Sequence, residues 1–195
     1  TLSSGTYTIT LQSGRDGNTI SDKCGNFAAA GQSVQVTVLG TLSITVTPRE
    51  VCVNSPAGVQ LQGNVAGGLP PGAVATWSTG ATGLTAQAYP SFSQPYFEEP
   101  YWEYYTLTVT LGGCSYSLRD SVRVHHLPRT EMVPAMVYTC GARPVELTGL
   151  ASILGGTWEV RTSGGWQALP VPVVLGPGSH QVRYVTPAGC VSETL

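Results

Sequence analysis

The stretch Tyr105-Thr-Leu-Thr-Val-Thr-Leu-Gly-Gly-Cys114 decides the expected fold. Threonine alternates with apolar residues over a strand-length run, and the two glycines then mark a turn. Related stretches occur at Gly5-Thr-Tyr-Thr-Ile-Thr-Leu11 and at His180-Gln-Val-Arg-Tyr-Val-Thr-Pro-Ala-Gly-Cys190. A unit that recurs along a chain indicates an array of similar modules. The sequence therefore predicts an all-β chain of tandem modules, each roughly 80 residues long.

Composition agrees with short strands and tight turns. The 195 residues include 24 glycines and 14 prolines, and only 10% of the residues are charged. A hydrophobic share of 42% is higher than that of a disordered chain. The formal net charge of −2 gives no electrostatic reason to expect nucleic acid as a partner. No apolar run approaches the length of a membrane span, so we expect no membrane insertion.

The strand pattern divides the chain into three parts. Residues 1–40 contain two alternating runs, and two strands alone are marginal, so we expect this part to be the C-terminal portion of a module whose front precedes Thr1. Residues 41–126 contain all the strands of a β-sandwich module. Residues 127–195 repeat the same order, and we expect this module to lack its last strand.

Five cysteines indicate a disulfide framework and an oxidising compartment. Two units read cysteine, tryptophan, cysteine, which predicts the pairs Cys52–Cys114 and Cys140–Cys190. Cys24 is then left over, and we expect its partner upstream of Thr1. A metal site is the weaker alternative, because the sequence has no C-x-x-C pair.

Between the two cysteines of each unit, a tryptophan lies in an alternating run. Trp77 falls in the run 73–79 and Trp158 in the run 156–160, both of which alternate as strands. Large aromatic side chains dominate the cores of small domains, so we expect both tryptophans to be core anchors.

These residues resemble the PKD-like, immunoglobulin-like repeats of very large surface proteins secreted by Bacteroidota. The matching motifs in the second part are Cys52, Val59-Gln-Leu61, Trp77-Ser-Thr-Gly80, Tyr105-Thr-Leu-Thr-Val-Thr110, Gly113-Cys114 and Val122-Arg-Val124. Those in the third part are Cys140-Gly141, Val145-Glu-Leu147, Trp158 and Gly189-Cys190. The chain departs from the pattern in the long loop before Cys24, and Trp158 lacks the Ser-x-Gly that usually follows.

The resemblance implies tandem immunoglobulin-like β-sandwich modules in an extracellular or cell-surface protein. Proteins of this kind are adhesins, gliding or attachment fibres, or stalks that accompany enzymes, and many are exported by the type IX secretion route. Neighbouring modules of the same chain would then be partners, as would other copies in a homo-oligomer or fibre.

The segment 89–104 interrupts the repeat and is rich in aromatic residues. With Tyr105 it holds eight of the sixteen aromatic residues of the chain, and prolines 90, 95 and 100 keep it from forming a helix. By alternation we expect one of Trp102 and Tyr104 to pack inward.

Three interpretations of these rings remain open. They pack on their own module, they contact a protein or another copy of the chain, or they form a platform for sugars beside Glu98, Glu99 and Glu103. The residues proposed for a contact surface are Tyr96, Phe97, Tyr101 and Trp102.

Two further groups of acidic residues are candidate sites of chemistry. Asp16 and Asp22 lie in a polar loop whose oxygens could bind Ca²⁺, although a plain turn at 16–18 fits the sequence better. Glu98 and Glu99 are neighbours on an extended segment and would point apart, unlike the facing acids of a glycosidase. We therefore expect no cofactor and no catalysis. The expected function is a structural or adhesive segment, and the alternative is a carbohydrate- or protein-binding module that uses residues 89–104.

Overall fold

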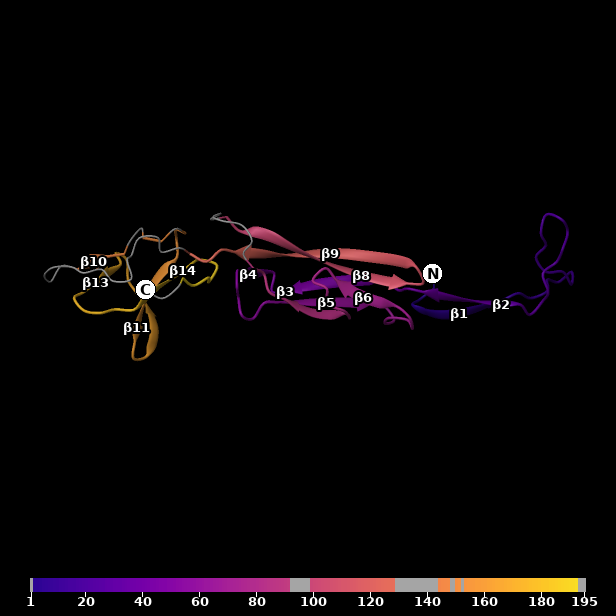
Figure 1. Cartoon of the computed structure of the whole chain (residues 1–195), viewed down its shortest axis with the longest axis horizontal. Helices are drawn as coiled ribbons and strands as arrows, with labels where there is room; N and C mark the ends of the chain where they lie inside the picture. Colours follow the sequence, from indigo (N-terminus) through magenta and orange to yellow (C-terminus); the bar gives the residue numbers. More distant parts are fainter. Residues whose placement is uncertain (1, 92–98, 129–143, 148–149, 152, 193–195) are drawn as a thin grey trace. The chain divides into compact units, whose positions relative to one another are not determined.

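The computed structural model describes residues 2–91, 99–128, 144–147, 150–151 and 153–192. Every regular element among these residues is a strand, and the strands form five sheets (Figure 1). The predicted all-β class is confirmed, and the sheets are compatible with a β-sandwich. The described part of the chain contains no helical segment with the length and apolarity needed to cross a bilayer.

The first part is a two-stranded antiparallel hairpin of β1 (Gly5–Thr10) and β2 (Ser33–Val38). Its alternation gives it a threonine-rich face and an apolar face, on which Ile9 lies opposite Val34. These two side chains are 54% and 57% exposed. The apolar face is therefore exposed at Ile9 and Val34, whereas Tyr7, Val36 and Val38 on the same face are partly buried.

Seven strands follow and form two sheets. They are β3 (Leu42–Thr47), β4 (Glu50–Cys52), β5 (Val59–Val65), β6 (Val74–Trp77), β7 (Thr85–Ala88), β8 (Tyr101–Leu111) and β9 (Cys114–His125). One sheet has the order β3-β5-β7 and the other the order β4-β9-β8-β6. Pro48 directly follows the last residue of β3, and proline cannot donate a ladder hydrogen bond. The chain then enters the other sheet, where β4 pairs in parallel with β9.

The inward faces of these two sheets meet at Gly63 and Leu107. Along β5 the side chains alternate strictly between buried and exposed, and Gly63 occupies an inward position. A Cβ atom placed on Gly63 would overlap Cδ2 of Leu107, which lies on β8 in the other sheet and is fully buried. Trp77 on β6 is 2% exposed and so lies in the core, where the sequence places it.

The last part has a small core of its own. Its strands are β10 (Val145–Glu146), β11 (Thr157–Thr162), β12 (Gly165–Ala168), β13 (Val174–Leu175) and β14 (Val182–Val185). They form a sheet of order β12-β11-β14 and a pair β10-β13. The buried cluster consists of Leu147, Trp158, Val173, Val182 and Tyr184.

Trp158 and Tyr184 meet edge to face in this cluster, with their ring centroids 5.3 Å apart. The Tyr184 hydroxyl donates a hydrogen bond to the carbonyl oxygen of Ile153 at 2.6 Å and accepts one from the Gly156 amide at 2.7 Å. Trp158 is thus a buried core residue, and Tyr184 ties the loop before β11 to that core.

The chain divides into two compact units. One contains residues 1–45, 61–86 and 105–120, and the other contains residues 46–60, 87–104 and 121–195. The limits of these units fall within β3, β5, β7, β8 and β9, and none falls at a predicted module boundary. The division into modules at 40/41 and 126/127 stays a prediction.

Candidate functional site

The disulfide of this structure joins Cys52 to Cys190, two residues 138 positions apart in the sequence. Cys52 is the last residue of β4, and the next residue, Val53, donates its amide to the carbonyl of His125 on β9 at 2.9 Å. Cys190 is 1% exposed and lies in a turn, where its amide donates to the Thr186 hydroxyl at 3.0 Å. The Cα atoms are 5.5 Å apart, the usual separation for a disulfide.

Both predicted cysteine pairs are therefore wrong. Cys52 lies in register with His125 at one end of β9, whereas Cys114 begins the same 12-residue strand at its other end. At about 3.3 Å per residue these ends are roughly 35 Å apart, far beyond the reach of a disulfide. Cys190 is bonded to Cys52 and so is not the partner of Cys140, which lies outside the described residues.

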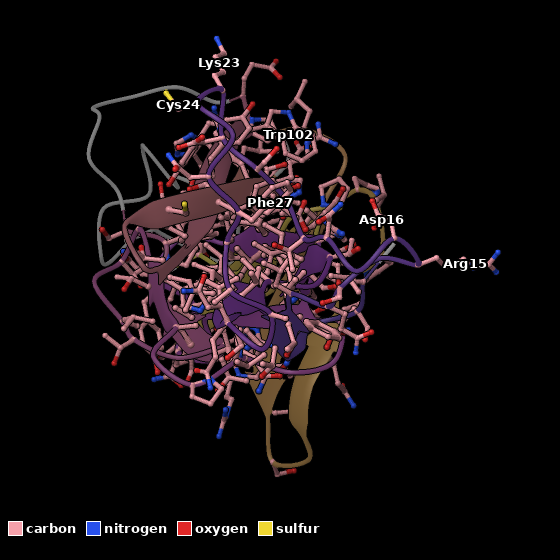
Figure 2. All side chains as sticks on the ribbon, turned by 90° about the vertical axis from the view of Figure 1, so that its right-hand side faces the viewer. Arg15, Asp16, Lys23, Cys24, Phe27 and Trp102 are labelled. Carbon is pink, nitrogen blue, oxygen red and sulfur yellow. A yellow bond between two sulfur atoms is a disulfide. The ribbon has the colours of Figure 1, made fainter. Side chains whose placement is uncertain are left out.

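Among the described residues, Cys24 and Cys114 are free and exposed. Cys114 directly follows the tight turn at Gly112 and Gly113, both of which have positive φ angles. Figure 2 shows Lys23 and Cys24 on a loop with their side chains directed away from the ribbon. The partner expected for Cys24 upstream of Thr1 stays a prediction.

The aromatic residues at the start of β8 alternate between the two faces of the sheet. Tyr105 is 3% exposed, whereas Trp102 and Tyr104 are 55% and 50% exposed. The expectation that Trp102 or Tyr104 packs inward is wrong. Side chains two positions apart on a strand point to the same face, so both share the outward side once Tyr105 is inward.

Tyr101 packs within its own chain. Its ring centroid is 5.5 Å from that of His126, and its hydroxyl donates to the Ser91 carbonyl at 3.5 Å. Partial burial raises the pKa of the Tyr101 hydroxyl above its ordinary value, and the negative charge of Glu103 raises it further. Tyr96 and Phe97, the other expected contact residues, lie outside the described residues.

Polar side chains accompany Trp102 and Tyr104 on the outward face of the four-stranded sheet. Glu50 on β4 lies 3.0 Å from Nε2 of His125 and 3.7 Å from Nη1 of Arg123, both on β9. These residues alternate with the buried Val51, Val122 and Val124, which fixes them on the opposite side of the sheet from the core. Two exposed aromatic rings, two basic groups and one carboxylate thus share a surface.

A second polar cluster, which the sequence did not predict, covers the sheet β12-β11-β14. The Arg183 guanidinium lies 4.4 Å from the ring centroid of Trp166, and that of Arg161 lies 5.4 Å from it. Arg183 Nε also donates to Glu159 Oε2 at 2.7 Å. The sequence contains a pattern from which this cluster could have been predicted, namely the alternation of charged and apolar residues over 158–161. Glu159 and Arg161 alternate on β11 with the buried Trp158 and the inward Val160.

The acidic loop residues stabilise turns. Asp16 accepts hydrogen bonds from the amide and side chain of Asn18 at 3.1 and 3.2 Å. Asp22 accepts three, from the amide of Cys24 and from the amide and side chain of Asn26, at 2.8 to 2.9 Å. These bonds lower the pKa of both carboxyl groups. Within the described residues, no cluster of three or more metal-ligating side chains occurs.

Comparison with known proteins adds no assignment. No family model matches the sequence, and no curated protein matches it either.

Proposed function

We propose that this chain is a structural and adhesive segment of a large extracellular protein, built from tandem immunoglobulin-like, PKD-like modules and without catalysis. The all-β fold and the recurring strand unit support this proposal. In the sequence, that unit appears at β1, β8 and β14, and in each case it forms a strand of an antiparallel pair.

The observation that carries the proposal is the Cys52–Cys190 disulfide. It links β4, which the sequence assigns to the second module, to the turn after β14, which the sequence assigns to the third, and both cysteines lie in the same compact unit of the structure. If the predicted module division holds, the two modules are tied by this bond as well as by the chain between them. A bond of this kind suits a segment that must hold its parts together under load. Disulfides persist in oxidising surroundings, which supports an extracellular or cell-surface location.

Native mass determination and electron microscopy of the intact parent protein test this function. We expect a very long chain that forms rods or fibres on the cell surface. A compact monomer without such an assembly would contradict the structural role.

A second candidate function is binding of carbohydrates or proteins through the outward face of the four-stranded sheet. The exposure of both Trp102 and Tyr104 favours it, because two rings roughly 6.6 Å apart along one strand can stack against a flat ligand. Glu50, Arg123 and His125 supply hydrogen-bonding groups on the same face.

The double substitution Trp102→Ala/Tyr104→Ala tests this second function on a glycan array and in cell-adhesion assays. Tyr116→Ala, which removes an exposed tyrosine of β9, is the matched control. Loss of glycan retention in the double variant alone supports binding, and equal retention by all three proteins contradicts it.

A further inference from the structure

We propose that the Cys52–Cys190 disulfide acts as a force bypass. When the chain is pulled at its two ends, tension passes from Cys52 to Cys190 through the sulfur–sulfur bond. Residues 53–189 then carry no load. The biological use of such a bypass rests on the proposed load-bearing function, whereas the bypass itself follows from the connectivity.

The disulfide closes a long loop of chain that cannot extend while the bond is intact. Its two Cα atoms are 5.5 Å apart although 138 positions separate them in the sequence. A fully extended chain spans at most about 3.3–3.6 Å per residue, so the closed loop withholds roughly 450–500 Å of extension. No amount of unfolding inside the loop can release that length while the bond is intact.

Most of the fold lies inside the loop. Strands β5 to β14 fall between the two cysteines, including the cluster of Leu147, Trp158 and Tyr184. Only β1 to β4 lie on the loaded path before Cys52. Tension can therefore strip β3 and β4 from their sheets and open the N-terminal hairpin, and this limits the extension of the oxidised chain to roughly 200 Å.

Reduction would release the withheld length. Cys190 is 1% exposed, whereas Cys52 is partly exposed, so an external dithiol should attack Sγ of Cys52. That step forms a mixed disulfide with Cys52 and expels Cys190 as a thiolate, which takes up a proton. The second thiol of the reagent then displaces Cys52 as a thiol, and the reagent leaves as its own disulfide.

Single-molecule pulling with handles at the two ends tests the bypass. The variant Cys24→Ser/Cys114→Ser/Cys140→Ser keeps only the proposed pair and prevents other pairings. We expect it to extend by no more than roughly 200 Å when oxidised and by a further step of roughly 450–500 Å once dithiothreitol is added. Replacing the remaining two cysteines by serine as well should give the full length without reductant.

Two results would overturn the proposal. The first is full extension of the oxidised triple variant. The second is release from the unsubstituted chain, on adding reductant, of two shorter steps of roughly 220 and 175 Å, the lengths expected of Cys52–Cys114 and Cys140–Cys190. These lengths do not depend on whether the parent protein forms rods, so a failed bypass and a failed structural role are distinguishable.

Discussion

Gly63 and Leu107 provide the sharpest test of how the two central sheets pack. Adding a methyl group at Gly63 forces it into Cδ2 of Leu107, and the Leu84 carbonyl oxygen lies 3.3 Å from the added atom on another side. Overpacking of this kind costs typically about 1–3 kcal/mol. Gly63 has no positive φ angle, so an effect of Gly63→Ala on stability would report packing and not backbone strain.

A double-mutant cycle identifies the contact. Leu107→Ala alone removes a fully buried side chain and should cost about 2–5 kcal/mol. In the double variant the new methyl group occupies part of the space that Leu107 leaves. The free energy of unfolding lost by the double variant should therefore be about 0.5–3 kcal/mol smaller than the sum of the losses of the two single variants. Chemical denaturation followed by tryptophan fluorescence gives each free energy of unfolding.

Gly176→Ala is the matched control, because Gly176 is exposed and a Cβ atom there meets nothing within 4 Å. It should change the free energy of unfolding by less than about 0.5 kcal/mol. A neutral Gly63→Ala, or costs that simply add in the double variant, would refute the face-to-face packing of the two sheets at this point.

Three further predictions concern other parts of the chain. Tyr184→Phe removes the hydroxyl that bridges two loop groups, so it should destabilise the last part by about 1–3 kcal/mol and speed hydrogen exchange at the Gly156 amide; unchanged exchange there would contradict the bridge. Asp22 should titrate below its ordinary value of 3.8, because the Asn26 side chain and nearby amides favour the charged form. Its contribution to stability should therefore be present above pH 3.8 and be lost as the pH falls through the lower folded pKa; an NMR titration of its carboxyl carbon at or above 3.8 would oppose this. Replacing Cys52 and Cys190 by serine should destabilise the oxidised chain by at most ~5 kcal/mol in the chain-entropy model, and equal melting with and without these cysteines would count against a stabilising bond.

Local sequence patterns predicted the strands well. The recurring stretch at 5–11 contains β1, the stretch at 105–111 lies within β8, and the stretch at 180–190 contains β14. The sequence does not predict the short strands β4, β7, β12 and β13, which have two to four residues each. So small a number of positions is too short to show an alternation of polar and apolar residues.

The cysteine pairing could not be predicted from those patterns. Spacing within a repeat suggested local pairs, but a disulfide needs Cα atoms within about 7 Å. The parallel pairing of β4 with β9 places Cys52 beside His125 and far along the strand from Cys114. That pairing is a long-range feature that no local period encodes.

The aromatic strand illustrates a different error. Alternation was enough to place Trp102 and Tyr104 on one face, because they are two positions apart and Tyr105 belongs to the inward set. Expecting one of the two to turn inward ignored that shared parity. The outward surface of β8 is consequently more aromatic than the sequence interpretation allowed.

Disulfide mapping of the oxidised protein is the most direct test of covalently joined repeats. The protein is digested without reductant, at a pH low enough to prevent exchange, and the linked peptides are identified by mass spectrometry. We expect one linked pair that contains Cys52 and Cys190. Linked peptides that join Cys52 to Cys114 and Cys140 to Cys190 would show that each repeat closes on itself, and would contradict a covalent connection between repeats.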